Sequence, residues 1–196
     1  MPKRIFHFVM IKPSHYDEDG YVIQFLRSAM PSNTLATIYG LAEDCRRRNV
    51  LGDDVELKFT EIDETNMRVR VDKIARRIKA DGGRGLIGLI GVQSNQFPRA
   101  MDLARQFRAH GLPVCIGGFH VSGCLAMLPG VTPELQEAQD LGIVDIALPQ
   151  LPGQLGIPPD GIGQIAQLGE AESEALDLAL VQLLPGGDPP LVPVLL

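Results

Sequence analysis

The chain has 196 residues, 45% of them hydrophobic, and a formal net charge of −6. This length suits one domain with an additional segment, because domains usually span roughly 100–200 residues. No apolar run reaches the ~20 residues of a membrane-spanning helix. Lys12 and Pro13 interrupt the apolar start, which argues against a secretory signal. We therefore expect a cytoplasmic protein with no membrane partner.

Basic residues are confined to the first part of the chain. All 18 Lys and Arg residues lie between Lys3 and Arg108. Residues 1–108 contain 14 acids and carry a net charge of +4, whereas residues 109–196 contain ten acids, no Lys or Arg, and carry −10. Such asymmetry marks a compositional boundary. Because acids are mixed with the bases at helical spacing, we interpret the basic part as a solvated surface and expect no nucleic-acid partner.

Three cysteines, Cys45, Cys115 and Cys124, are scattered without the spacing of metal ligands. We expect reduced, mostly buried thiols. No other set of residues has metal-ligand spacing either, so no metal site is predicted.

Hydrophobic periodicity predicts alternating strands and helices as far as residue 116. A first strand is expected at 4–11, followed by a polar loop at 12–21. The continuous apolar run at 86–92 is typical of a central parallel strand that is buried on both faces. The other predicted elements are helices at 35–48, 68–80 and 97–110 and strands at 55–62 and 112–116.

This alternation predicts an α/β fold with a doubly wound parallel sheet, Rossmann-like or flavodoxin-like, of four to five strands within a domain at 1–146. Ligands of such sheets bind beyond the carboxyl ends of the strands. We therefore expect a site formed by the loops at 12–21, 63–67, 92–97 and 117–124.

Residues 147–196 form a tail rich in Pro, Gly and Leu. One helix is predicted before it, around 134–141, and the segment 161–184 is a candidate for a last strand and helix. Two interpretations of the tail stay open. It is either a native continuation of the domain or foreign sequence from about Pro149 onward, produced by a frame shift or a truncated gene.

Two of the loops carry the strongest functional signal. Gln93, Ser94 and Asn95 follow the strand at 86–92, and Gly117-Gly118-Phe119-His120 follows the strand at 112–116. Consecutive polar side chains suit hydrogen bonding to a ligand, and adjacent glycines let a ligand approach the backbone. Taken separately, the first motif also fits a helix N-cap and the second a tight turn. Their neighbouring positions favour a ligand site.

Residues 86–123 resemble the cobalamin (vitamin B12)-binding Rossmann-like domain of cobalamin-dependent radical-SAM proteins. That family carries a Ser after its third strand and Gly-Gly after its fourth, and Ser94 and Gly117-Gly118 match by position. The resemblance implies that these residues contact the nucleotide tail of cobalamin, assisted by Gln93 and Asn95. It extends over about 4–145, and Gly-Glu-Ala-Glu at 169–172 is similar to a motif after the family's fifth strand.

The resemblance further implies that the loop at 12–21, with Ser14, His15 and Tyr16, covers the corrin ring, and it places Phe119 and His120 beside the ligand. The family's Asp-x-His-x-x-Gly motif is absent, because no Asp stands two residues before His15 and Gly20 comes five residues after it. We therefore expect no histidine on the cobalt.

A radical-SAM core is also absent from this sequence. Its iron–sulfur cluster requires Cys-x-x-x-Cys-x-x-Cys, which the chain does not contain. No complete catalytic motif was found, so enzymatic activity of the chain alone is left open.

Three hypotheses remain. The first is a cobalamin-binding module related to radical-SAM methyltransferase-type enzymes, inactive alone and partnered by a radical-SAM domain in trans. The second is a flavodoxin-like domain for another nucleotide cofactor, for which Tyr16, Tyr21, Phe97 and Phe119 are the aromatic side chains available. The third is an inactive truncated fragment.

Overall fold

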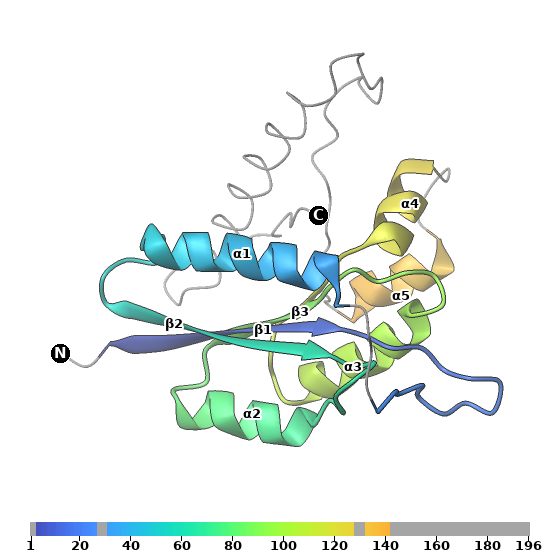
Figure 1. Ribbon diagram of the computed structural model, residues 1–196, viewed down its shortest axis with the longest axis horizontal. Helices are drawn as coiled ribbons and strands as arrows, with labels where there is room; N and C mark the ends of the chain where they lie inside the picture. Colours follow the sequence, from blue (N-terminus) through green and yellow to red (C-terminus); the bar gives the residue numbers. More distant parts are fainter. Residues whose placement is uncertain (1–2, 27–30, 128–131, 142–196) are drawn as a thin grey trace, which may run out of the picture.

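The structure is a computed structural model and describes residues 3–26, 31–127 and 132–141 (Figure 1). The tail at 147–196, including the strand and helix expected within 161–184, lies outside these residues. Strands and helices alternate along the described chain. The strands are β1 (Arg4–Lys12), β2 (Val55–Asp63), β3 (Gly85–Leu89) and β4 (Val114–Ile116). The helices are α1 (Asn33–Arg47), α2 (Val71–Ala80), α3 (Phe97–Ala109), α4 (Phe119–Met127) and α5 (Pro133–Asp140).

The four described strands form one parallel sheet in the order β2-β1-β3-β4. The chain first moves outward from β1 to β2 and then returns past β1 to β3, so the direction of winding reverses between β1 and β3. Helix α1 accordingly lies on one face of the sheet, and α2 and α3 lie on the other (Figure 1). This arrangement confirms the predicted doubly wound α/β fold, and the winding reversal marks the edge at which such folds bind ligands.

Both faces of the sheet are buried. Side chains alternate along β1, so Phe6, Phe8 and Met10 contribute to the core beneath α1, whereas Val9 and Ile11 contribute to the core beneath α2 and α3. Helix α1 is amphipathic and begins at an N-cap, where the Leu35 N–H donates to Ser32 Oγ at 3.2 Å. Two-sided burial explains why β1 and β3 appear as continuous apolar runs in the sequence.

The structure differs from the predicted elements by three residues or more at three places. Helix α4 begins directly after Gly118, where a loop was expected at 117–124. Its sequence has no charged residue and includes Gly123, so it lacks the polar and apolar alternation of a surface helix. Helix α2 begins at Val71 and not at 68, because Arg70 has a non-helical backbone. Strand β3 ends at Leu89, three residues earlier than predicted.

The three cysteines are free thiols and mostly buried, as the sequence predicts. Cys45 and Cys115 are buried free thiols, and Cys124 is partly buried. Burial raises the pKa of Cys115 to about 12, so this thiol stays protonated at neutral pH. Within the described residues, no helix has the length and apolar character needed to cross a membrane.

Candidate functional site

Backbone hydrogen bonds join the segments that leave β3 and β4. The Gly117 N–H donates to the Leu89 carbonyl at 2.9 Å, and the Val92 N–H donates to the Gly117 carbonyl at 2.9 Å. The His120 N–H then donates to the Val92 carbonyl at 3.1 Å. The two loops singled out in the sequence therefore lie side by side at the carboxyl end of the sheet, as their topology predicts.

Gly118 has a structural role at this junction. Its φ angle is +140°, and a Cβ atom placed there would lie 2.2 Å from the Val92 nitrogen. The space beside Gly118 that was expected to admit a cofactor tail is thus filled by the backbone of the neighbouring loop. Gly118 is therefore glycine because two backbones meet at this position.

His120 is held on both sides of its ring. Its Nδ1 lies 3.1 Å from Ser94 Oγ, and its Nε2 lies 3.4 Å from a carboxylate oxygen of Glu134 in α5. The ring also packs against Phe97, with 4.4 Å between ring centroids, and Cys124 Sγ lies 3.9 Å from Nε2. The structure therefore brings Ser94 and His120 together, as their positions at the ends of β3 and β4 led us to expect.

Polar side chains next to this pair face solvent. Gln93, Ser94 and Asn95 are all exposed. Amide and hydroxyl groups at these positions can donate and accept hydrogen bonds to a ligand that lies across the β3 and β4 exits. Gln96, in contrast, is buried: its Oε1 accepts from the Gln93 N–H at 3.0 Å, and its Nε2 donates to the Pro13 carbonyl at 2.9 Å.

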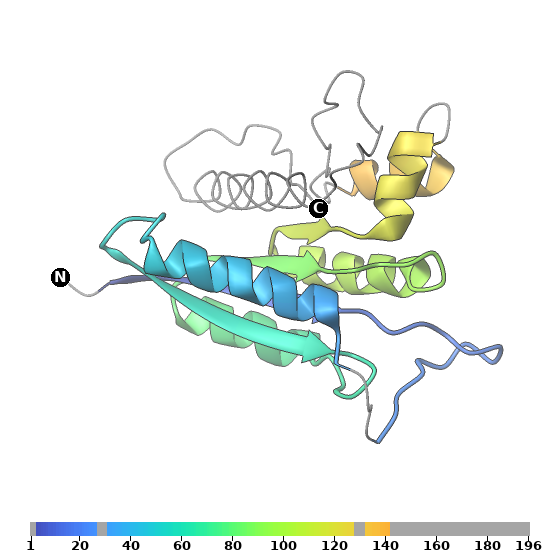
Figure 2. The same ribbon diagram turned by 45° about the horizontal axis from the view of Figure 1, so that its top comes forward.

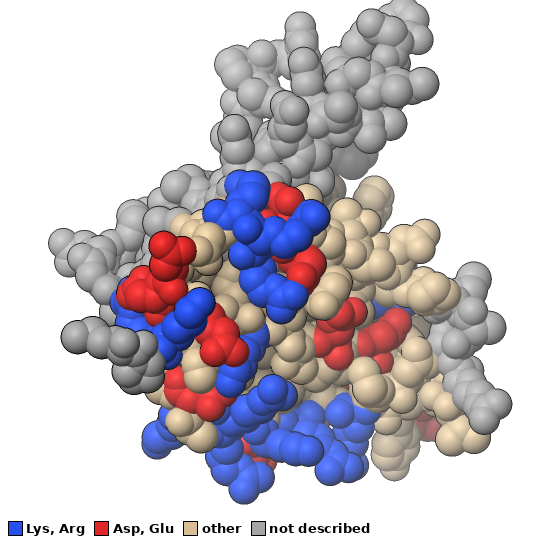
Figure 3. Space-filling model, turned by 60° about the vertical axis from the view of Figure 1, so that its left-hand side comes forward, with Lys and Arg blue, Asp and Glu red and all other residues tan. Residues whose placement is uncertain are grey.

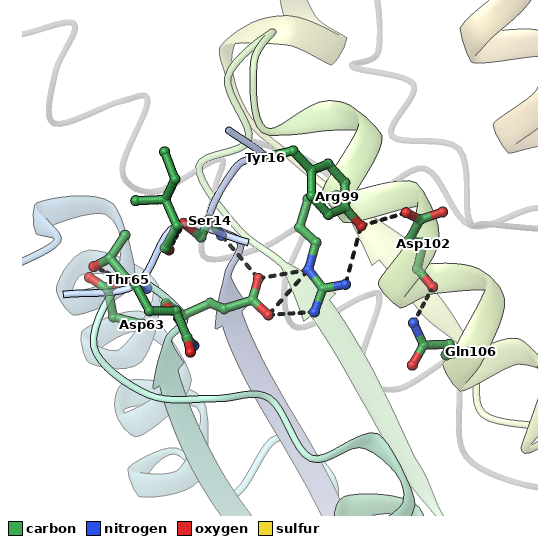
Figure 4. A network of polar contacts seen from close by, with 10 residues as sticks. Ser14, Tyr16, Asp63, Thr65, Arg99, Asp102 and Gln106 are labelled. Atoms are coloured by element: carbon green, nitrogen blue, oxygen red, sulfur yellow. Dashed lines mark hydrogen bonds and ion pairs between the residues drawn. The ribbon is translucent and has the colours of Figure 1, made fainter. Parts of the chain in front are cut away.

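The loop after β1 is anchored by a buried ion pair (Figure 4). Glu64, in the loop after β2, is 1% exposed, and one of its carboxylate oxygens accepts from Arg99 Nη2 of α3 at 2.6 Å. Its other oxygen accepts from the Ser14 N–H at 3.1 Å. The Tyr16 hydroxyl donates to Asp102 at 2.6 Å and accepts from Arg99 Nη1 at 3.3 Å. This network connects three segments at the carboxyl end of the sheet.

The surroundings in this network shift the pKa values of Tyr16 and Arg99. Burial raises the pKa of Tyr16, and the hydrogen bond to Asp102 raises it further. Burial acts to lower the pKa of Arg99, but its bonds to Glu64 and Tyr16 outweigh that effect and leave the pKa above its usual value. The Tyr16 hydroxyl and the Arg99 guanidinium therefore keep their protons at neutral pH. The ion pair between Arg99 and Glu64 and the hydrogen bonds that Arg99 and Tyr16 donate hold the network together.

The three residues predicted from this loop differ in what they can reach. Ser14 is fully buried, and its hydroxyl donates to the Ile23 carbonyl at 2.5 Å, so it supports the loop. Its role as a cofactor contact stays a prediction. Tyr16 is engaged by α3, as described above. The His15 side chain is partly buried and forms no hydrogen bond within the described part of the chain.

Exposed apolar side chains surround the same end of the sheet. The large hydrophobic residues that are exposed in the described part of the chain all follow the carboxyl ends of strands: Tyr21, Phe25 and Leu26 after β1, Met67 after β2, and Phe119 after β4. Phe119 is 75% exposed. Because proteins usually bury such side chains, their concentration at one edge favours an interaction there with a large, partly apolar molecule.

The sequence analysis did not identify Glu64 and Arg99 as residues of this edge of the sheet. They are 35 residues apart, and neither belongs to a motif that the chemistry of a known site would require. The one available signal was the position of Glu64 directly after a predicted strand, in a loop already expected at the ligand edge. Within the described residues, no group of three or more His, Cys, Asp or Glu side chains is arranged to hold a metal ion.

Comparison with known proteins adds no assignment, because no family model matches the chain and no curated protein is significantly similar to it.

Proposed function

We propose that this chain is a cobalamin-binding module. The fold by itself does not select a ligand, because sheets of this type bind many cofactors. The proposal is supported by the resemblance of residues 86–123 to the cobalamin-binding family and by the close approach of Ser94 to the segment that follows Gly117-Gly118.

The residues present fit such a ligand in its two chemically different parts. Cobalamin has a broad, largely apolar ring rimmed by amides, and a polar nucleotide tail. Gln93, Ser94 and Asn95 would hydrogen-bond the tail, and Tyr21 and Phe119 would contact the apolar parts of the ring. When bound, cobalamin supplies a cobalt centre that can carry a methyl group. The chain's own contribution is binding and orientation, and a radical-SAM domain in trans would be the partner in methyl transfer.

The observation that carries the proposal is the combination of exposed polar and exposed apolar side chains at one edge. The polar side chains lie in the segment after β3, next to the winding reversal of the sheet. The apolar side chains lie in the segments after β1, β2 and β4. A small polar ligand would not need the apolar side chains. A flavin would need an aromatic stacking partner. Phe97 is buried against His120 and Tyr16 is held by Arg99 and Asp102, which leaves Tyr21 and Phe119 for that role.

The test is direct binding. The purified chain is incubated with hydroxocobalamin, separated from free ligand by gel filtration and examined by absorption spectroscopy. We expect about one equivalent of cobalamin in the protein fraction. Replacing both Gln93→Ala and Asn95→Ala should weaken binding about tenfold or more, since two hydrogen bonds at roughly 0.5–1.5 kcal/mol each are lost.

A matched control is Gln106→Ala with Gln136→Ala, which removes two exposed amides from α3 and α5 and should change affinity less than twofold. A folded protein that elutes without cobalamin would refute the proposal. If the same protein retained flavin mononucleotide instead, the nucleotide-cofactor hypothesis would replace it. Retention of neither ligand would favour the inactive fragment.

A further inference from the structure

The exposed side of α2 and the segment before it is strongly basic. Six exposed cations gather there, and we call them the α2 basic face: Arg68, Arg70, Lys73, Arg76, Arg77 and Lys79. Asp72 is the one acid within residues 68–80, so this stretch carries a net charge of +5. Val71, Ala75 and Ile78 occupy the opposite side of the helix and are buried in the core. Figure 3 shows Lys and Arg side chains along the lower edge of the molecule, where α2 lies.

These cations differ from the other exposed basic cluster. At the end of α1, Arg46 pairs with Glu43, and Arg47 and Arg48 both pair with Asp44. By contrast, no residue of the α2 basic face forms an ion pair with any described residue.

Several cations of the α2 basic face also lie three or four positions apart. Lys73 and Arg76 form one such pair within α2, and Lys73 and Arg77 another. Like charges at these spacings repel each other and destabilise a helix. The helix therefore keeps an electrostatic cost that interspersed acids would have removed, as they do on α1.

We propose that the α2 basic face is a docking surface for an acidic region of another protein. Carboxylates presented at this surface would relieve the repulsion among the cations and form ion pairs with them. The guanidinium groups, four of the six cations, can each bind a carboxylate through two parallel hydrogen bonds. The surface lies outside the loops of the candidate site and does not depend on the cofactor proposed above.

The net charge of the chain and the composition of the α2 basic face favour an acidic protein over a nucleic acid as the partner. The whole chain has a net charge of −6 and a sequence pI of about 5.2, so a polyanion that extends far beyond this face meets a chain that is acidic in sum. The face contains no aromatic side chain on which a base could stack. A carboxylate patch on a folded partner is short and contacts the basic face alone.

The experiment measures binding of a fluorescein-labelled ten-residue poly-glutamate peptide by fluorescence anisotropy in 50 mM salt. The test variant is Arg70→Gln/Lys73→Gln/Arg77→Gln. The control variant, Arg46→Gln/Arg47→Gln/Arg48→Gln, removes the same charge from α1, where the cations are already paired. We expect at least tenfold weaker binding for the test variant and less than a twofold change for the control. Circular dichroism shows whether each variant is folded.

Three outcomes would overturn the proposal. Equal weakening by both variants would show that only total charge matters. Absence of binding by the unmodified protein would show that the face does not attract carboxylates. Tighter binding of a 20-nucleotide single-stranded DNA than of the peptide, lost in the test variant alone, would assign the face to nucleic acid.

Discussion

His7 is a buried, hydrogen-bonded histidine far from the candidate site. Its side chain is 1% exposed, and its Nε2 lies 2.9 Å from a carboxylate oxygen of Asp81, which also accepts from Lys58 at 3.1 Å. Burial is the main cause that lowers the pKa of His7 below 6.5, and the positive charges of Arg77 and Lys58 act in the same direction. Asp81 opposes them without reversing the shift. The folded protein therefore favours the neutral ring.

Folding stability should consequently depend on pH through this residue. The neutral ring's contribution is fully present above the unfolded-state pKa of about 6.5 and is lost as the pH falls toward the lower folded-state value. We expect the free energy of unfolding, measured with urea, to decrease from pH 7 to pH 5. His7→Gln should remove much of that decrease, whereas His110→Gln, at an exposed histidine, should retain it. A His7→Gln variant with the same pH dependence as the unmodified protein would contradict this account.

At the scale of elements, the junction between the β3 and β4 exits depends on Gly118. Alanine at this position would place its Cβ atom against the Val92 backbone and would have to adopt a φ of +140°. Nearby in α4, a Cβ atom at Gly123 meets no atom within 4 Å. The two glycines are close in the sequence but have opposite steric surroundings.

We therefore predict opposite effects of the same substitution. Gly118→Ala should lower the free energy of unfolding by about 2 kcal/mol or more, through overpacking and backbone strain. Gly123→Ala should raise it by about 0.5–1 kcal/mol, because alanine loses less conformational freedom in a helix. Urea unfolding of both variants is the measurement. Equal destabilisation by both would show that the junction tolerates a side chain at Gly118.

The elements could be predicted well wherever one physical signal dominated. Strands β1 and β3 are buried on both faces and appear as apolar runs, and α1 shows apolar residues at helical spacing. Helix α4 could not be predicted because it has neither charge nor clear periodicity. In the site, the proximity of Ser94 and His120 follows from the rule that parallel strands end at one edge. The burial of Ser14 depends on Glu64, a partner 50 residues away that no local pattern indicates.

At the scale of the whole molecule, the Glu64–Arg99 ion pair connects segments that are far apart in the sequence. It joins the loops after β1 and β2 to α3, and Glu64 is almost fully buried, whereas Arg99 is 14% exposed. Removing one partner of such a pair leaves an uncompensated charge in the interior, which costs about 3–5 kcal/mol. Domains of this size are stable by only about 5–15 kcal/mol, so this change should threaten the whole fold.

We expect Arg99→Met to lower the free energy of urea unfolding by about 3–5 kcal/mol. The double variant Glu64→Gln/Arg99→Met should recover part of that loss, because glutamine removes the unpaired charge and keeps an oxygen that can accept from the Ser14 N–H. Arg105→Met is the matched control: Arg105 pairs with Asp102 and Glu137 on the surface, where all three side chains are over 40% exposed, and its loss should cost about 0–1 kcal/mol. If Arg99→Met were as mild as the control, the ion pair would not hold these segments together. If the double variant were less stable than Arg99→Met, the cost would lie in lost hydrogen bonds and not in the buried charge.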